Sequence, residues 1–207
     1  MVKFVNYILE NVGVKFNAHK LKKIIDFNFV VIEKVIVRLV KLYPVYLDFY
    51  EGIVLNEVIL AGITRSDRIL HIGCGPIPAT SILLVRKTQA NVTGIDINQS
   101  SVKQAQKLVV MSNLQDVIQI KHADAKDFSV SNFDIIVISQ GVKPYDKILN
   151  NISKEMKKDA KVIFRTSSTP TGEISQKDLF LKDIFKIERI VAQKKNATLI
   201  SVLLLKK

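Results

Sequence analysis

The sequence predicts an α/β fold: a mostly parallel, seven-stranded sheet preceded by a small helical region. From residue 67 onward, short β-branched and aliphatic runs alternate with helical patterns, and this alternation is typical of parallel strands joined by crossover helices. Near the C-terminus, two strand-like runs are separated only by the polar turn 193–196, which predicts a closing antiparallel hairpin. The expected strands are 69–72, 91–95, 117–121, 133–139, 160–165, 184–192 and 197–205.

Helical patterns occupy the segments between the strands and most of the N-terminal third. Within 20–42, apolar residues recur at helical spacing. Pro44 is expected to end this helix, because its ring excludes helical continuation, and a further helical segment runs to about Gly62. We therefore expect two parts: residues 1–66, a helical region that forms a lid or the substrate side, and residues 67–207, the sheet domain. The other expected helices are 78–88, 99–112, 144–157 and a short one near 175–182.

Length and composition bound the class of protein. A chain of 207 residues is long enough for one medium domain with a full core. Its single cysteine excludes a disulfide framework and a multi-cysteine metal site. Charged residues interrupt the apolar stretch 27–42, so no membrane span is predicted, and no secretory signal is recognised at the start. We expect a cytoplasmic protein with no membrane partner; a homo-oligomer stays open.

The chain is basic, with 31 Lys and Arg against 19 Asp and Glu, a net charge of +12. Such a balance is compatible with nucleic acid, an anionic membrane surface or an acidic substrate. The lysines are scattered, however, and the chain has no tryptophan and no basic stripe interleaved with aromatic residues. Nucleic acid is therefore a disfavoured partner, and a small-molecule acceptor is expected instead.

The strongest local signal is a glycine loop between a buried strand and a helix. The run 69–72 leads directly into Gly73-Cys74-Gly75-Pro76, after which a helical pattern opens. Such a turn leaves backbone N–H groups and the positive end of the helix facing a ligand. Gly73 lets the chain turn, and Gly75 lets a ligand approach the backbone because no Cβ stands in the way.

A carboxylate about twenty residues further on sharpens this signal. The apolar run 92–95 ends in Asp96, and an acidic residue at the end of the second strand accepts hydrogen bonds from ribose hydroxyls in nucleotide-binding βαβ units. Pro78 stands where a dinucleotide-binding loop has its third glycine, which argues against a pyrophosphate cofactor. A ligand with a ribose and no phosphate, such as S-adenosylmethionine (SAM), fits better.

The remaining crevice residues follow from the rule that ligands bind such sheets at the carboxyl ends of the strands. Asp124 follows the third strand and would accept from an adenine amino group, or else cap its own turn. The backbone N–H of Ala125 would meet an adenine ring nitrogen, and Ser139 ends the fourth strand. The candidate cofactor-binding residues are Gly73, Cys74, Gly75, Pro76, Asp96, Ile97, Asp124, Ala125 and Ser139.

Other reactive residue types give weaker signals. His71 lies inside the first strand and is interpreted as a core histidine, and His122 has no evident partner. Nothing cationic near Cys74 in the sequence marks it as an activated thiolate. No metal site is predicted. A mostly parallel sheet that ends in a hairpin is the layout of the Rossmann-like class I SAM-dependent methyltransferase fold, whose chemistry needs no protein nucleophile because the sulfonium of SAM is already activated.

At these residues the chain resembles a known family. The stretch 73–84, GCGPIPATSILL, resembles the GxGPxPxTSIxL signature of nicotianamine synthases and their archaeal and bacterial relatives. Upstream, the YPVY stretch 43–46 and Glu57 resemble that family's YPxY stretch and the glutamate that follows it. Phe164-Arg165-Thr166 matches its Arg-Ser/Thr strand end, and 196–202 resembles its closing strand. The resemblance covers residues from about 40 to 207.

The resemblance implies transfer of the 3-amino-3-carboxypropyl group of SAM to a small amine or amino acid, with release of methylthioadenosine. Tyr46 or Tyr50 would position the substrate amine, Glu57 or Glu33 would take its proton, and Arg165 would hold a carboxylate bidentately. Core packing for the tyrosines and a solvent-facing position for Glu57 are the structural alternatives. Two other functions stay open: an ordinary SAM methyltransferase, and a protein that binds SAM or a nucleoside without turnover.

Overall fold

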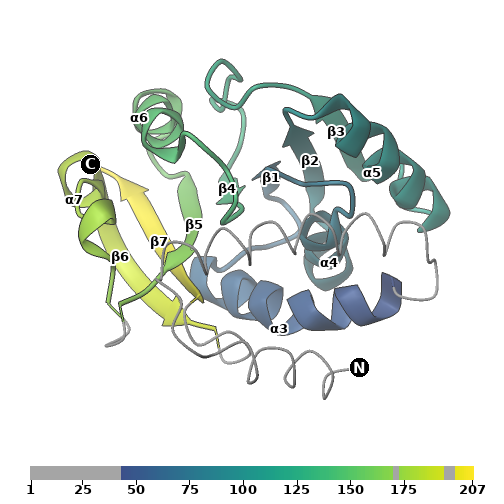
Figure 1. Cartoon of the computed structure of the whole chain (residues 1–207), viewed down its shortest axis with the longest axis horizontal. Coiled ribbons are helices and arrows are strands. Elements are labelled where there is room, and N and C mark those ends of the chain that lie inside the picture. The colour runs from purple at the N-terminus through teal and green to yellow at the C-terminus, as the bar shows by residue number, and fades with distance from the viewer. Residues whose placement is uncertain (1–42, 170–172, 194–198) are drawn as a thin grey trace, which may run out of the picture.

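The computed structural model describes residues 43–169, 173–193 and 199–207, which form an α/β fold around one sheet (Figure 1). Its seven strands lie in the order β3-β2-β1-β4-β5-β7-β6. The first five run parallel, and β7 lies antiparallel to both of its neighbours. The strands are β1 (Arg68–Ile72), β2 (Asn91–Asp96), β3 (Ile118–His122), β4 (Ile135–Ile138), β5 (Lys161–Ser167), β6 (Phe185–Ala192) and β7 (Leu199–Lys206).

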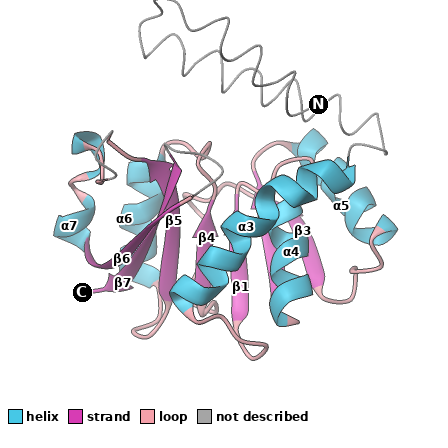
Figure 2. Cartoon of the chain, turned by 90° about the horizontal axis from the view of Figure 1, so that it is seen from below, coloured by secondary structure: helices cyan, strands magenta, loops and turns pink. Residues whose placement is uncertain are grey.

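Helices cover both faces of this sheet, and the predicted fold class is confirmed (Figure 2). One face packs against α3 (Tyr43–Ala61), α4 (Ala79–Thr88) and α5 (Gln99–Met111), and the other against α6 (Tyr145–Glu155) and α7 (Leu181–Ile184). The short helix expected near 175–182 is a 3₁₀ turn, Gln176–Asp178, followed by α7. No helix within the described ranges is long and apolar enough to cross a membrane.

The closing hairpin is antiparallel, as predicted, but its second strand lies inside the sheet. β7 pairs with both β5 and β6, which leaves β6 at the edge. The burial of the two strands explains this order. All residues of 199–204 are buried, whereas most of β6 is partly or fully exposed. A strand that is apolar toward both faces gains most from an interior position.

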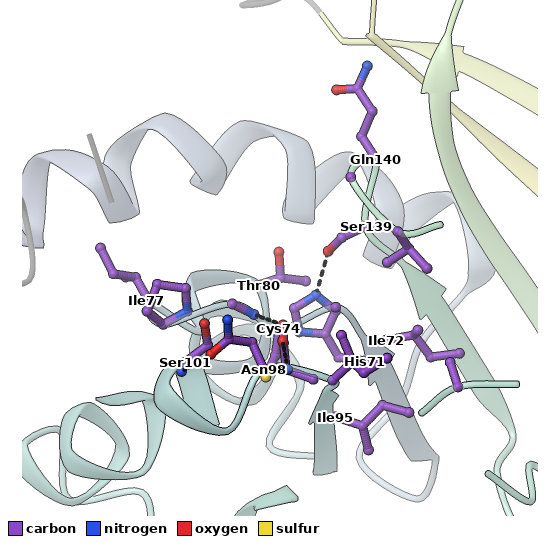
Figure 3. A pocket seen from close by; sticks show the side chains of 18 of the residues that line it. His71, Ile72, Cys74, Ile77, Thr80, Ile95, Asn98, Ser101, Ser139 and Gln140 are labelled. Atoms are coloured by element: carbon purple, nitrogen blue, oxygen red, sulfur yellow. Dashed lines mark hydrogen bonds between the residues drawn. The ribbon is translucent and has the colours of Figure 1, made fainter. Parts of the chain in front are cut away.

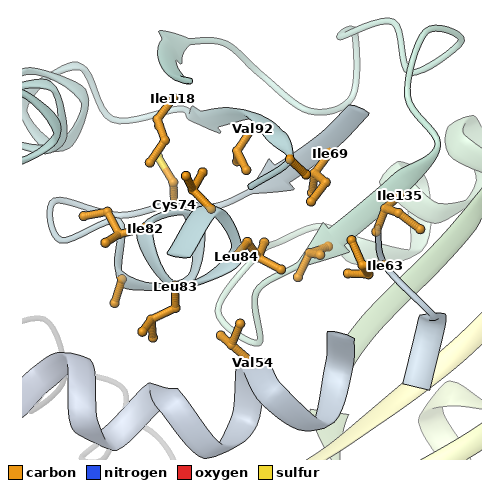
Figure 4. Packing of buried hydrophobic residues seen from close by; sticks show 14 of the residues in the cluster. Val54, Ile63, Ile69, Cys74, Ile82, Leu83, Leu84, Val92, Ile118 and Ile135 are labelled. Carbon is orange, nitrogen blue, oxygen red and sulfur yellow. The ribbon is translucent and has the colours of Figure 1, made fainter. Parts of the chain in front are cut away.

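Buried aliphatic side chains join α3 and α4 to the sheet (Figure 4). Val54 of α3, Leu84 of α4 and Ile69 of β1 are each 0% exposed and belong to one cluster. The last part of the predicted helical region therefore packs on the sheet domain. The division at residue 66 stays a prediction, because 1–42, including the expected helix 20–42, lies outside the described residues.

Local sequence explains where helices begin. Pro44 lies in the first turn of α3, where a missing N–H costs no intrahelical hydrogen bond. Pro44 therefore lies at the start of α3, and the helix that it is expected to end lies outside the described residues. Asn98 caps α5, because its side chain accepts hydrogen bonds from the backbone N–H groups of Ser100 and Ser101. This cap fixes the start of α5 directly after the end of β2.

The central strands should carry much of the stability of the fold. Val137 of β4 is fully buried, whereas Val110 of α5 is 59% exposed. Val137→Ala should lower the free energy of unfolding by about 2 kcal/mol, from lost burial and the cavity left behind. Val110→Ala should change it by less than about 0.5 kcal/mol. Urea denaturation of both variants tests this, and equal losses would contradict it.

Candidate functional site

A cleft of about 760 Å³ opens at the carboxyl ends of the parallel strands (Figure 3). Its walls come from the ends of β1, β2 and β4, the loops after β1 to β4, and residues of α3, α4, α5 and β5. Tyr46, Tyr50 and Arg165 line this cleft, whereas Glu57 does not, and Glu33 lies outside the described residues. All predicted cofactor-binding residues line it: Gly73, Cys74, Gly75, Pro76, Asp96, Ile97, Asp124, Ala125 and Ser139.

The glycine loop turns sharply from β1 toward α4. Gly73 and Gly75 have φ angles of +76° and +65°, a left-handed conformation that glycine adopts without strain. A Cβ at Gly73 would also collide with the side chain of Val142. The backbone N–H groups of Gly73 and Cys74 both donate to the carbonyl oxygen of Ile95, at 2.9 and 3.1 Å. The loop is therefore fixed to the end of β2.

Asp96 completes this connection with its side chain. Its Oδ2 accepts from the backbone N–H of Gly75 at 2.9 Å, and its Oδ1 accepts from that of Asn98 at 2.8 Å. Because each carboxylate oxygen can accept a further hydrogen bond, both oxygens still have acceptor capacity toward the cleft. The carboxylate thus holds the glycine loop and the start of α5 together while facing the space predicted for a ribose.

The predicted adenine side of the cleft lies beyond β3. The Oδ1 of Asp124 accepts from the backbone N–H of Lys126 at 2.9 Å, and its Oδ2 lies 3.0 Å from the Lys126 ammonium. The backbone hydrogen bond, followed by that of the ammonium, lowers the pKa of Asp124 below its usual value. This carboxylate caps its own turn, as the structural alternative expects, and its ligand role stays a prediction. Ala125 is buried, and Ile97 is 65% exposed at the rim.

Two tyrosines of α3 face one another across one helical turn. The rings of Tyr46 and Tyr50 have centroids 5.1 Å apart, and their hydroxyl oxygens are 3.5 Å apart. The guanidinium carbon of Arg165 lies 5.8 Å from the centroid of the Tyr50 ring, a distance at which the cation is attracted to the ring face. The tyrosines thus combine core packing with a position on the cleft wall.

Glu57 and Arg165 form a buried, bidentate ion pair. Nε and Nη2 of Arg165 donate to Oε1 and Oε2 of Glu57, each at 2.7 Å, and the two residues are 3% and 0% exposed. Burial alone would lower the pKa of Arg165, but the charge and hydrogen bonds of Glu57 raise it above its usual value. The edge of Arg165 expected to hold a ligand carboxylate therefore holds Glu57. The ligand role of Arg165 and the base role of Glu57 stay predictions.

Further hydrogen bonds surround this ion pair. Nη1 of Arg165 donates to Thr80 at 2.9 Å, and the Ser201 hydroxyl donates to Glu57 Oε1 at 2.7 Å. Gln193 donates to Ser201 and accepts from Asn56, both at 2.9 Å. The network thereby links α3, α4, β5, β7 and the residue after β6 through polar side chains.

The residues predicted for the site do not include Thr80, Ser201 and Gln193. Ser201 carries a usable signal, because it is the lone polar residue in the apolar run 199–205, and a buried hydroxyl requires a partner. Gln193 lies in the predicted turn and gives no such signal. Among the described residues, no group of three or more His, Cys, Asp and Glu side chains could hold a metal ion.

His71 lies on the floor of the cleft between two serines. Its Nε2 is 2.9 Å from the Ser139 hydroxyl (Figure 3). Its Nδ1 is 2.8 Å from the Ser81 hydroxyl. Burial, helped by the positive charge of Arg165, lowers the pKa of His71 to about 3. The histidine is buried as expected, but it also lines the cleft.

This strand order, with a glycine loop after β1 and a carboxylate at the end of β2, defines a class I SAM methyltransferase-like fold. A solved structure of a glutamate-to-glutamine mutant of MtNAS in complex with S-adenosylmethionine is similar, with a TM-score of 0.67 and 22% identity. That match covers 77% of this chain and 62% of the MtNAS chain.

The sequence model of the family described as "Nicotianamine synthase protein" matches residues 28–196. The chain belongs to this family, and the resemblance of the glycine loop is confirmed.

Curated relatives include a demethylmenaquinone methyltransferase of Lactobacillus johnsonii. It is 33% identical over 119 residues, which are 54% of this chain and 48% of the relative. An L-histidine 2-aminobutanoyltransferase of Pseudomonas aeruginosa is 25% identical over 118 residues, 56% of this chain and 45% of the relative. The chain spans about half the length of these two relatives.

The buried ion pair should matter far more to stability than an exposed one on the same helix. Glu57→Ala leaves Arg165 buried without its counter-charge and should lower the free energy of unfolding by about 3–5 kcal/mol. Glu51→Ala removes a pair with Lys87 in which Glu51 is 48% exposed, and should cost about 0–1 kcal/mol. Chemical denaturation of the two variants measures the difference; similar losses would refute it.

The low pKa of His71 should make stability depend on pH. An unfolded histidine binds a proton near pH 6.5, whereas folded His71 binds one only near pH 3. Between these values the unfolded chain holds more protons at this site, so His71 lowers stability by up to about 1.4 kcal/mol per pH unit as the pH falls. His71→Gln should therefore lose less stability between pH 7.5 and 5 than the wild type. Equal losses in urea titrations would show that His71 is not held neutral.

Proposed function

We propose that this protein transfers the 3-amino-3-carboxypropyl group of SAM to a small amine or amino acid and releases methylthioadenosine. The observation that carries the proposal is the cleft, in which Asp96 holds the glycine loop of a nicotianamine synthase family member at the carboxyl end of β2. The MtNAS structure with S-adenosylmethionine supports the choice of ligand. The name of the aminobutanoyltransferase relative supports the choice of transferred group.

The described residues suit recognition of a nucleoside without a phosphate. Asp96 would accept hydrogen bonds from ribose hydroxyls, and Ile97, with 65% of its surface exposed, would cover the adenine. Asp124 and the backbone N–H of Ala125 would contact the adenine edge. Gly75 leaves room for the ligand beside the loop.

The transfer itself requires orientation more than activation. The acceptor nitrogen attacks the carbon of the aminocarboxypropyl group that is bonded to the sulfonium sulfur. The bond between this carbon and the sulfur breaks, and its electron pair neutralises the sulfur. The nitrogen then releases a proton to the solvent. Tyr46 and Tyr50 lie on the wall formed by α3 and would position the amine. Glu57 is bound on both oxygens and fully buried, so we assign it to positioning Arg165 rather than to proton removal.

A SAM-dependent methyltransferase acting on a small molecule is the second candidate. It is favoured by the demethylmenaquinone methyltransferase, the relative with 33% identity. The chain spans about half the length of each curated relative. The identity of the acceptor is therefore a proposal for both activities. The cytoplasmic location and any homo-oligomer also stay predictions.

Mass spectrometry of the small molecules distinguishes the two transfers. The protein is incubated with SAM and a pool of amines and amino acids. Methylthioadenosine, together with an acceptor that gains an aminocarboxypropyl group, is the expected result. S-adenosylhomocysteine with a methylated acceptor would instead establish the methyltransferase.

Asp96→Ala should weaken SAM binding at least about a hundredfold, because it removes the ribose acceptors and frees the glycine loop from β2. Asp116→Ala is the matched control, since Asp116 is exposed in the turn between α5 and β3, away from the cleft residues. Isothermal titration calorimetry gives both affinities. Unchanged binding by the Asp96 variant would show that the ribose lies elsewhere.

A further inference from the structure

The two hydrogen bonds of His71 determine whether the Ser139 hydroxyl, directly after β4, can donate a hydrogen bond into the cleft. Each joins a ring nitrogen to a serine hydroxyl, and a neutral imidazole carries a proton on only one of its nitrogens. Two arrangements are therefore available. Either Ser81 donates to Nδ1 and Nε2–H donates to Ser139, or both bonds are reversed.

Ser81 decides between these arrangements. Ser81 is 0% exposed. Within the described part of the chain, its hydroxyl forms a hydrogen bond with Nδ1 of His71. If Nδ1 carried the proton, the Ser81 hydrogen would be buried without an acceptor, which is costly. Ser81 therefore donates to Nδ1, and the His71 proton lies on Nε2.

The consequence appears at Ser139. Its Oγ accepts the Nε2–H proton of His71, so its own hydrogen is available to the cleft, which both residues line (Figure 3). Ser139 is half-buried, and the exposed Lys143 lines the same wall four residues further on. A hydroxyl donor in a cleft that is also lined by an ammonium group is suited to a carboxylate oxygen.

We propose that His71 is a positioning residue that presents the Ser139 hydroxyl as a donor to a carboxylate of the ligand. This rests on the proposed function, in which two carboxylates are candidates: that of SAM and that of an amino-acid acceptor. His71 itself transfers no proton to or from the substrate. Its low pKa keeps the donor arrangement unchanged across the physiological pH range.

The proton placement is tested without any ligand. Nitrogen-15 NMR of the histidines, with His71 assigned by its loss in His71→Gln, distinguishes a protonated from an unprotonated ring nitrogen. We expect the neutral form with hydrogen on Nε2 at pH 7. A proton on Nδ1 would overturn the proposal, even in a preparation that does not bind SAM.

The ligand contact is tested with two substitutions of the same histidine. The amide of glutamine reaches the position of Nε2 and can still donate to Ser139, whereas the shorter asparagine reaches only that of Nδ1. If the bound carboxylate is that of SAM, His71→Asn and Ser139→Ala should each weaken SAM binding about tenfold or more, and the double variant should bind SAM no more weakly than Ser139→Ala alone. His71→Gln should stay within about threefold of wild type. Ser131→Ala, an exposed serine outside the cleft, is the control.

Methylthioadenosine separates a carboxylate contact from damage to the cleft, because it lacks the aminocarboxypropyl group. If the contact is to the carboxylate of SAM, methylthioadenosine should bind all five variants as it binds the wild type. If SAM affinity is unchanged and the KM of an amino-acid acceptor rises in His71→Asn and Ser139→Ala, the contact is to the acceptor carboxylate. Loss of methylthioadenosine affinity in parallel, or no change in either SAM affinity or acceptor KM, would overturn the proposal. Wild-type protein that binds no SAM would refute the proposed function instead.

Discussion

A buried ion pair between Glu57 and Arg165 joins α3 to the sheet beside the cleft. Both charges are withdrawn from water, with exposures of 0% and 3%, and such burial is costly unless every donor and acceptor finds a partner. Here the two direct hydrogen bonds are supplemented by Thr80 and Ser201. The pair consequently fixes the position of α3, on which Tyr46 and Tyr50 line the cleft.

The part of the cleft wall formed by the glycine loop is fixed by a different set of contacts. Asp96 binds the glycine loop and the start of α5, and the backbone carbonyl of Ile95 binds the loop a second time. On the floor, His71 connects α4 to the end of β4 through Ser81 and Ser139. The cleft is thus assembled from hydrogen-bonded elements, which suits a reaction that depends on orienting an already activated sulfonium compound.

The sequence predicts the fold well because the signals for its elements are local. The strand–glycine–helix pattern at 69–88 and the carboxylate of Asp96 belong to one βαβ unit. Their spacing places both at the carboxyl ends of the parallel strands. Partners across the chain could not be predicted in this way. Glu57 and Arg165 are separated by 108 positions, and each carries a charge that a ligand could equally well satisfy. Only the packing of α3 on the sheet shows that they bind each other. The interior position of β7 likewise depends on tertiary packing, because the sequence does not specify whether this strand lies at the edge or inside the sheet.

Hydrogen–deuterium exchange of α3 tests most directly whether this helix and the cleft are held together by the ion pair. Glu57→Gln keeps the shape of the side chain and removes its charge. If the pair fixes α3, amides of Tyr43–Ala61 should exchange at least about tenfold faster in the variant, while those of α5 (Gln99–Met111) keep their wild-type rates. Unchanged exchange in α3 would show that its apolar contacts alone hold the helix. An equal acceleration in both helices would show that the pair stabilises the whole fold rather than the position of α3. Either result would contradict the account.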